Sequence, residues 1–451
     1  MTTRPYRLLH KHTRSMATFF WKSCLAVPFL CLVFVSAQAP VQAAVQITVT
    51  PSIATSTEYD DNIFLEENDT ESDMLFIVSP GIGIDIRSPR TAGSISYTPS
   101  KVFYQENSQL DNWRHYANLS FLHDFSQFLS FRLQDTYLQT DDPLAEDIRD
   151  LTEEEIKDRA RQGRNEYWRN NLSGAFAYQF GPGNRISAGY TYNILQEKSD
   201  AEDDAREQGP FVNVKYRLDE KNAFTADFNT KQYDYEREDG QAARDDIQAH
   251  NMNISYIRNI TEQTSTNVGY GVGTRNYDGE TPDYIVHDLS TGLSHTFSQN
   301  FSASLGVGYF YQDEEGGGDS EGYSFRGSVR RRFEFCSIGL SAEHGWDEDF
   351  LDRTPEGFTR FWRFSANWRC TPTEHLQVFA NFSYRIEDEE NGSDEDIITA
   401  QCGISRSFFR WYAISLRYLY QLNESDLTEE EYTDNRVTLT LSFSRPYTWM
   451  Y

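Results

Sequence analysis

A strict two-residue alternation of apolar and small polar side chains constrains this chain more than any other feature of its sequence. It is clearest in residues 284–311, where two alternating arms are separated only by Ser298, Gln299 and Asn300. Successive side chains of a β-strand point to opposite faces, so each arm has one apolar face, and the short connection predicts a tight hairpin. The apolar face comprises Ile285, Leu289, Leu293 and Phe297 in the first arm and Phe301, Ala303, Leu305, Val307, Tyr309 and Tyr311 in the second.

The composition fits a membrane β-barrel built from further copies of this hairpin. The 451 residues are polar, with 24% charged residues and a formal net charge of −28, yet 15% are aromatic. Disordered chains are poor in aromatic residues, which argues against disorder. A barrel needs lipid-facing side chains only at alternate positions, so it can span a bilayer with a hydrophilic average composition. After the N-terminus, no apolar run approaches the roughly 20 residues of a membrane helix.

The N-terminus has the features of a secretory signal peptide, which we assign to residues 1–43. Five basic and no acidic residues lead into an apolar core, and small residues up to Ala43 allow cleavage there. Met16 is an alternative start, because the segment that follows it is by itself a signal peptide of normal length. We expect residues 44–451 to form a single barrel domain, whose 36 basic and 69 acidic residues give it a net charge of −33.

Connections of alternating length predict an all-β fold, a closed antiparallel transmembrane β-barrel of about 20 strands, with 18 as the alternative. Outer-membrane barrels of bacteria have short periplasmic turns and longer external loops, and closure removes the two unpaired edges of an open sheet. A soluble β-solenoid or propeller is the other architecture, but no repeat motif of fixed length supports it. The short connections include 124–127, 219–222, 259–263, 371–373 and 408–410, and the long ones include 60–72, 141–163, 199–209, 312–321, 347–357, 387–396 and 422–434.

Two short stretches resemble the opening of the β-barrel porin 2 family. Residues 58–64 match the Tyr-Asp-Asn pattern that closes the first strand in that family, and Pro80 with Gly81 matches a Pro-Gly pair in its second strand. The resemblance implies an outer-membrane barrel from a Gram-negative bacterium. Members of the family are often linked to exopolysaccharide production and export. The family offers no catalytic residue to transfer to this chain.

The last expected strand resembles an assembly signal of outer-membrane barrels. Its apolar face alternates with polar residues and ends in the aromatic Phe443, whereas residues 445–451 extend past it, a modest departure from that signal. We therefore expect the barrel-assembly machinery, outer-membrane lipid and lipopolysaccharide as partners, and no nucleic acid.

Arginines recur on the strand face that we assign to the barrel interior. Arginine binds carboxylate, phosphate or sulfate groups in a bidentate manner, so such a wall can favour anionic solutes or acidic glycans. Alternatively, the arginines neutralise inward acids such as Asp227, Asp288 and Glu343, since the interiors of wide barrels are wet and mixed in charge. The candidate pore-lining residues are Arg132, Arg185, Arg326, Arg330, Arg332, Arg363, Arg369, Arg385, Arg417 and Arg436.

The long connections are strongly acidic, with runs at 153–155, 202–204, 387–390 and 429–431. Carboxylate oxygens attract hard cations such as Ca²⁺ and Mg²⁺, so we expect diffuse cation binding on solvated loops next to lipopolysaccharide. None of the runs has the spacing of an EF-hand. We assign no metal ligand and no cofactor to the chain.

The connection 141–163 is the longest and carries a helical pattern. Asp142 can cap a helix and Pro143 suits its first turn. The apolar positions at near-helical spacing are Leu144, Ile148, Leu151 and Ile156. An apolar stripe needs a cover, and we expect an external lid against neighbouring loops, with a constriction folded into the pore as the alternative.

Three cysteines follow the signal peptide. Cys336 begins one expected strand and Cys370 ends the next, both near short turns and both facing outward, which permits a disulfide in an oxidising compartment. Cys402 lies two strands further on and is expected to be free. Zinc is not expected, because the chain has no Cys-x-x-Cys pair and its histidines are scattered.

The pattern also argues against an enzyme. Residues 318–322 match the Gly-x-Ser-x-Gly pattern of serine hydrolases, but that motif requires a strand, a sharp turn and a helix. Here it lies in a glycine-rich acidic loop before a strand, and the histidines are too dispersed to form a catalytic group with it.

These observations predict a pore in the outer membrane of a Gram-negative bacterium. A barrel of about 20 strands without a plug domain is open or narrowed by loops, so passage is passive. The family resemblance favours polysaccharide export through a partly arginine-lined interior, with a periplasmic export adaptor as partner. A general or anion-preferring diffusion porin is the alternative, and a closed structural surface barrel is the third.

Overall fold

The described part of the chain is built from β-strands, with one short 3-10 helix at Ser108–Leu110. The computed structural model describes residues 45–144, 163–199, 203–237, 244–350, 356–389, 394–426 and 431–451, so the predicted signal peptide lies outside it. No helix in these ranges is long and apolar enough to cross a membrane. The strands are β1 (Gln46–Asp60), β2 (Asp73–Arg87), β3 (Thr91–Tyr104), β4 (Asn112–Asp124), β5 (Leu129–Thr140), β6 (Tyr167–Gly181), β7 (Asn184–Glu197), β8 (Asp203–Arg217), β9 (Asn222–Arg237), β10 (Ile247–Asn259), β11 (Thr264–Tyr277), β12 (Tyr284–Ser298), β13 (Phe301–Glu314), β14 (Ser320–Arg332), β15 (Cys336–Asp349), β16 (Glu356–Thr373), β17 (Leu376–Glu389), β18 (Glu395–Phe408), β19 (Tyr412–Ser425), β20 (Tyr432–Ser444) and β21 (Tyr447–Met450).

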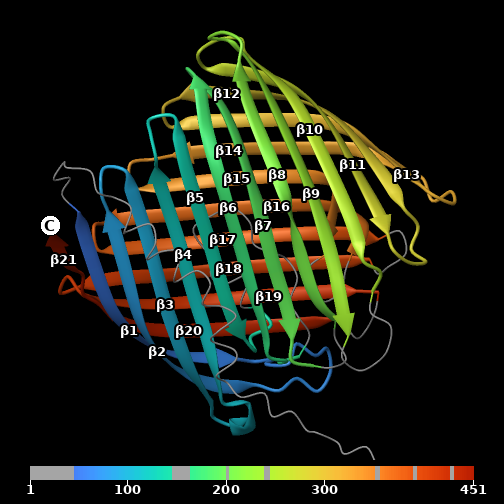
Figure 1. Ribbon diagram of the computed structural model, residues 1–451. Helices are drawn as coiled ribbons and strands as arrows, with labels where there is room; N and C mark the ends of the chain where they lie inside the picture. The colour runs from blue at the N-terminus through green and yellow to red at the C-terminus, as the bar shows by residue number, and fades with distance from the viewer. Residues whose placement is uncertain are drawn as a thin grey trace, which may run out of the picture. The chain divides into compact units, whose positions relative to one another are not determined.

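The strands form one closed antiparallel sheet. Each pairs with its neighbours in the sequence, and in Figure 1 the blue and green strands lie in front of the orange and red ones. β1 also pairs with β20 and β21, in a single register that sets Ser52 opposite Ser444 and Val49 opposite Tyr447. β20 and β21 are therefore one strand interrupted at Pro446, and the 21 strands make a 20-stranded barrel. The predicted barrel of about 20 strands is confirmed, and the alternative of 18 is wrong.

The residues after the last predicted strand complete the seam of the barrel. The backbone N–H of Arg445 donates to the carbonyl of Pro51 at 3.2 Å, and Val45 and Tyr451 exchange two backbone hydrogen bonds of 2.9 Å. Pro446 interrupts the strand because it has no N–H to donate. The extension that departs from the assembly signal is thus part of the wall.

Some strands continue beyond the apolar alternation into segments expected to be loops. β8 begins at Asp203, although the sequence predicts a connection over 199–209. Its first residues are polar on both faces, as Asp204 and Arg206 alternate with Asp203 and Glu207. The hydrophobic alternation ends where the outward face no longer meets lipid, so it does not mark the whole strand. The long-loop ends of the strands therefore form a polar rim.

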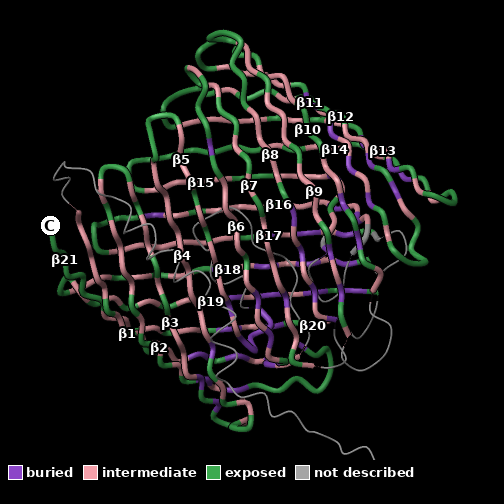
Figure 2. The backbone as a smooth tube through the Cα atoms, viewed as in Figure 1, coloured by how far each residue is buried: buried purple, intermediate pink, exposed green. Residues whose placement is uncertain are grey.

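The two faces of the wall differ as the alternation predicts. On the outward face, Leu289, Leu305 and Tyr309 are 56%, 51% and 49% exposed, as lipid-facing side chains are in a barrel without its membrane. Buried residues gather instead at the long-loop ends of the strands (Figure 2). Burial inside a barrel requires groups that fold into the interior, and these groups form the candidate site.

Candidate functional site

The register of the strands places the ten candidate arginines on the inward face. Directly opposite residues of neighbouring strands share a face. Arg326, Glu343, Arg363 and Arg385 are successive partners across β14–β17, on the face opposite to the exposed Trp368. The other seven, on the equivalent face of their strands, are Arg132, Arg185, Arg330, Arg332, Arg369, Arg417 and Arg436. Their role in lining a pore remains a prediction.

Some of these arginines are paired with acids, as the neutralisation hypothesis expects. Arg326 binds Glu343, and Arg385 binds Glu387. Of the other acids offered as partners, Asp227 instead accepts a hydrogen bond of 2.6 Å from the Asn213 amide. Neutralisation therefore accounts for part of the set.

Several candidate arginines lie close to the short-turn end of the barrel. Arg132 and Arg185 lie near the start of β5 and β7, Arg330 and Arg332 end β14, and Arg369 lies near the end of β16. In the aqueous interior of a barrel, such a concentration of guanidinium groups attracts anions.

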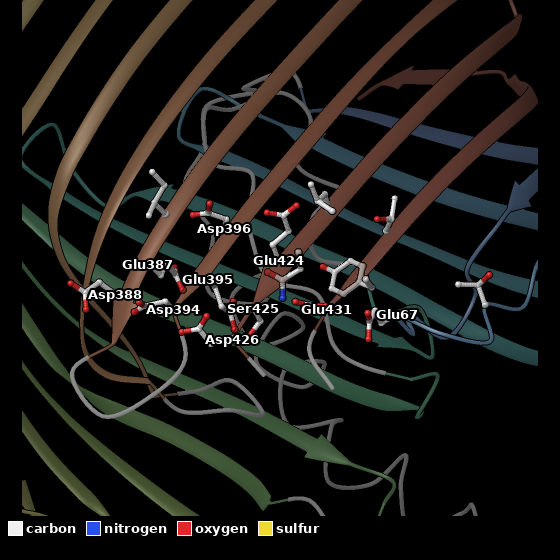
Figure 3. A pocket seen from close by; sticks show the side chains of 16 residues that line it. Glu67, Glu387, Asp388, Asp394, Glu395, Asp396, Glu424, Ser425, Asp426 and Glu431 are labelled. Carbon is white, nitrogen blue, oxygen red and sulfur yellow. The ribbon is translucent and has the colours of Figure 1, made fainter. Parts of the chain in front are cut away.

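The opposite end of the barrel is acidic. A pocket of about 700 Å³ lies at the long-loop ends of β17–β20, and Figure 3 shows its side chains converging from these strands and from the loop after β1. Its lining contains no lysine or arginine. The acidic lining residues are Glu67, Glu387, Asp388, Asp394, Glu395, Asp396, Glu424, Asp426 and Glu431. The barrel thus has a basic short-turn end and an acidic mouth.

The first part of the long connection 141–163 folds into the barrel. Asp141 accepts a hydrogen bond of 2.7 Å from Arg114 Nε and one of 2.6 Å from the Tyr104 hydroxyl. Asp142 accepts one of 2.8 Å from Arg436 Nη1, on β20. Asp142 follows β5, so this contact passes over β1–β4 on the inner side of the wall. Leu144 continues the path and is buried beside Leu65, Leu419 and Tyr432.

The last part of the same connection returns to the same place. The buried Arg164 donates to Asp60 Oδ2 at 2.7 Å, to the Ile63 carbonyl at 2.6 Å and to the Tyr104 hydroxyl at 2.9 Å. The described ends of the connection are therefore fixed inside the mouth. This favours the constriction over the external lid that we expected, while the helical pattern over 145–162 lies outside the described residues.

The motif that carries the family resemblance, residues 58–64, supplies partners on the wall for the connection 141–163. Asp61 accepts hydrogen bonds of 2.7 Å and 2.8 Å from the backbone and side-chain amides of Asn435 on β20. Asn62 is buried and donates to the carbonyls of Glu66 and Thr433. The motif thus joins the end of β1 to β20 and presents Asp60 to the interior.

Burial and charge act in opposite directions on the two anchor acids of the loop. Burial alone would raise the pKa of Asp142. The adjacent Arg436 and Arg114 lower it by more than burial raises it, so the pKa is well below the ordinary value. The pKa of Asp141 is lowered in the same way. Burial raises it, but the neighbouring Arg114 and Arg164 lower it by more. Both carboxylates are therefore ionised at neutral pH.

A second loop crosses the interior from the other side. Glu348, at the end of β15, accepts hydrogen bonds of 2.9 Å from Arg275 Nε on β11 and 2.7 Å from the Tyr284 hydroxyl on β12. A register shift near Asp347 and Asp349 interrupts the alternation there, which allows Glu348 to point inward.

Phe350, two residues further on, extends this crossing. The Phe350 carbonyl accepts a hydrogen bond of 2.7 Å from the Tyr235 hydroxyl on β9, and its ring lies 5.3 Å from that of Tyr233. Phe350 belongs to a buried apolar cluster on the inner wall, together with Leu138, Tyr167, Leu195, Ala205, Tyr233, Tyr235, Ile247 and Ala249. The two anchored loops thus occupy different sectors of the mouth.

Cys336 and Cys370 are opposite each other on β15 and β16 and form a disulfide in the structure. The bond lies near the short-turn end, beneath the strands that carry the second anchored loop. Cys402 is free and exposed on the outward face of β18.

Sequence reasoning missed most of the anchor residues. Arg114, Arg164 and Asp434 are polar residues whose partners are distant in the sequence, and Glu348 and Phe350 lie in a segment expected to be a solvated loop. One signal was present, because Asp60, Asp61 and Asn62 form the most specific motif in the chain.

Comparisons with known proteins agree with this fold. No protein-family model matches the chain, and no curated protein matches it, so the β-barrel porin 2 family remains a resemblance. Solved structures do match. The FrpB iron transporter of Neisseria meningitidis has a TM-score of 0.52 at 9% identity, over 88% of this chain and 81% of that chain. The siderophore receptor PirA of Pseudomonas aeruginosa has a TM-score of 0.50 at 9% identity, over 90% and 81%. The outer membrane protein OpdK of Pseudomonas aeruginosa has a TM-score of 0.43 at 10% identity, over 89% and 99%.

The chain is a porin-like β-barrel of the Gram-negative outer membrane. The closed 20-stranded wall, its apolar outer face and its polar interior support this conclusion directly, since only closed barrels let strands cross lipid with every backbone group paired. The similarity to solved structures shows the fold. The cargo is a matter for proposal.

Proposed function

We propose that the protein is a passive channel for hydrophilic solutes, narrowed at its long-loop end by the two anchored loops. The observation that carries this proposal is that each loop binds the inner wall through a buried ion pair, Asp142 with Arg436 and Glu348 with Arg275. Removing one partner of such a pair leaves an unpaired buried charge, so each loop is held firmly in place. A segment held across the interior restricts the size of the solutes that pass.

Small side chains on the inner wall leave space beside these loops. β11, β12 and β13 place Gly271, Gly292 and Gly306 on the inward face, next to serines such as Ser290 and Ser304. These glycines and serines contribute little volume to the interior, and Asp288, opposite Gly271, is a charged side chain on the same face. This supports a route for solutes along the β11–β13 side.

The charge of the short-turn end supports a preference for anions on that side. Arg132, Arg185 and Arg332 are exposed on the inward face there. At physiological salt the Debye length is about 8 Å, so these charges act on solutes that pass close to the wall. We expect weak anion preference and rectification, because the acidic mouth opposes anions at the other end.

The same separation of charge favours a second candidate cargo, an acidic polysaccharide that moves outward. Arginines at the short-turn end would attract a polyanion, and the acidic mouth would repel it once it has passed. The family resemblance points to the same cargo, and a periplasmic export adaptor would then be the partner. The third hypothesis, a closed structural barrel, predicts no conduction at all.

Conductance of the refolded protein in a planar bilayer tests the proposal. We expect discrete channels with a reversal potential in a salt gradient that indicates anion preference, and different currents at the two polarities. Arg332→Gln should reduce the anion preference. Arg331→Gln is the matched control, because Arg331 is next to it on β14 but lies over the outward rings of Phe301 and Phe333.

Three results separate the candidates. Block by an acidic polysaccharide added at the short-turn side favours export, whereas conductance without block favours a diffusion porin. A protein that is folded by its heat-modifiable gel shift but never conducts contradicts the channel proposal and leaves the structural barrel.

A further inference from the structure

Three carboxylates meet at the seam of the barrel, where β1 and β20 reach the mouth. Asp60, Asp61 and Asp434 each offer one oxygen, and these oxygens lie within 4.8 Å of one another. Oxygens on opposite sides of a Ca²⁺ ion are about 4.6–5.2 Å apart, because Ca–O distances are about 2.3–2.6 Å. The distances between these oxygens are therefore short enough for all three to bind a single Ca²⁺ ion.

One of these three carboxylates, Asp434, has an oxygen without a donor. Asp434 is 0% exposed, and its Oδ2 accepts a hydrogen bond of 2.6 Å from Arg436 Nε. Its Oδ1 is buried as well and has no hydrogen-bond partner within the described ranges. A buried carboxylate oxygen without a donor is strongly unfavourable, so the position requires a positively charged or protonated neighbour.

The charges around this oxygen do not balance. Three arginines, Arg114, Arg164 and Arg436, bind acids in the anchor. The acids within the same network are Asp60, Asp61, Asp141, Asp142 and Asp434. If all five carboxylates were ionised, they would exceed the three guanidinium groups by two negative charges, which one divalent cation, or protons on the buried acids, would neutralise.

We propose that Asp60, Asp61 and Asp434 bind a divalent cation, Ca²⁺ by its preference for carboxylate oxygens, at the seam of the barrel. All three ligands are oxygens, which suits Ca²⁺ and excludes the sulfur or imidazole ligands that zinc prefers. This site differs from the diffuse binding expected on the loops.

The ion has a structural consequence at this position. Asp60 and Asp61 end β1, and Asp434 lies at the start of β20, so one ion joins the first and last strands at the mouth. Asp60 also binds Arg164 of the long connection at 2.7 Å. Bound Ca²⁺ thus stabilises both the seam and the anchored loop.

Terbium luminescence excited through tyrosine tests the site in the refolded full chain, in zwitterionic micelles free of lipopolysaccharide. We expect a saturable Tb³⁺ signal that Ca²⁺ displaces. Asp434→Asn should raise the half-saturating Tb³⁺ concentration by about tenfold or more, because ligand charge sets the affinity of calcium sites. Glu431→Gln, an acid of the neighbouring pocket, is the matched control and should leave it unchanged. Ca²⁺ should also raise the temperature of the heat-modifiable gel shift in the wild type but not in Asp434→Asn.

Several outcomes overturn the proposal. If the wild type shows no saturable Tb³⁺ luminescence, the proposal is overturned without the need for any variant. An equal loss in Asp434→Asn and Glu431→Gln shows diffuse binding at the mouth, and an unchanged signal in Asp434→Asn shows that a proton, not a metal ion, neutralises the cluster. Should Asp434→Asn give no folded band, Asp61→Asn replaces it, since Asp61 is only partly buried and an asparagine there can still accept a hydrogen bond from Asn435.

Discussion

Replacing Asp142 by asparagine should release the first anchored loop and widen the channel. Asp142 is buried between Arg436 at 2.8 Å and Arg114 at 3.2 Å, on the inner side of the wall. The substitution keeps the shape of the side chain and removes its charge, so two buried guanidinium groups lose a partner. Breaking a buried ion pair in this way costs about 3–5 kcal/mol.

Most of that cost falls on the docking of the loop. On the wall, Arg436 retains Asp434 and Asp60, and the loop retains its Asp141–Arg114 pair beside the lost contact. At about 1.4 kcal/mol per factor of ten, the ratio of docked to released loop falls by roughly 100- to 4,000-fold. We therefore expect Asp142→Asn to show larger single-channel conductance, or frequent transitions to a larger level.

The assay is single-channel recording beside a gel-shift check of folding. Asp278→Asn is the matched control, because Asp278 is an exposed loop acid of the same chemistry, and its conductance should equal that of the wild type. A folded Asp142→Asn protein with wild-type conductance would falsify the reasoning, since it would mean that the loop does not limit the channel.

Phe350→Ala should release the second loop and increase conductance, because truncating a buried phenylalanine costs about 3–5 kcal/mol. If the two loops are anchored independently, this increase should add to that of Asp142→Asn. A double variant whose conductance equals that of either single variant would contradict this independence. The lowered pKa values of Asp141 and Asp142 stabilise docking above the ordinary carboxyl pKa of about 4 and lose that effect only as the pH falls through the lowered values. The contribution of the first loop, measured as the difference in conductance between Asp142→Asn and the wild type, should therefore be constant from about pH 7 to pH 5 and be lost only below about pH 4, and a loss already near pH 6 would speak against these anchors. Serine at both Cys336 and Cys370 should lower the temperature of the heat-modifiable gel shift, since a disulfide with a sequence separation of 34 contributes about 4 kcal/mol in the chain-entropy model, and an unchanged temperature would argue that the barrel already restrains that hairpin.

The alternation of side chains was sufficient to predict the wall. Lipid contact imposes a period of two on the outward face, so residues such as Leu305 and Val307 could be placed outward, and the number of alternating arms gave about 20 strands. The pairing of Cys336 with Cys370 could be anticipated for the same reason, because consecutive strands of a barrel are neighbours. The beginning of β8 at Asp203 could not, because no lipid lies outside the polar rim to impose the pattern.

Local sequence patterns establish the class of fold, the inward and outward faces and the concentration of acid in the long loops. The closed sheet is needed to see that the connection 141–163 starts and ends inside the mouth, and that Arg436 binds Asp142. The physical reason is the range of the interactions. Strand faces follow from neighbouring residues, whereas the anchor joins Asp60, Asp142, Arg164 and Arg436, which meet only after the sheet has closed on itself. Closure brings β1 and β20 together, and the candidate cation site exists at that seam alone among the described residues.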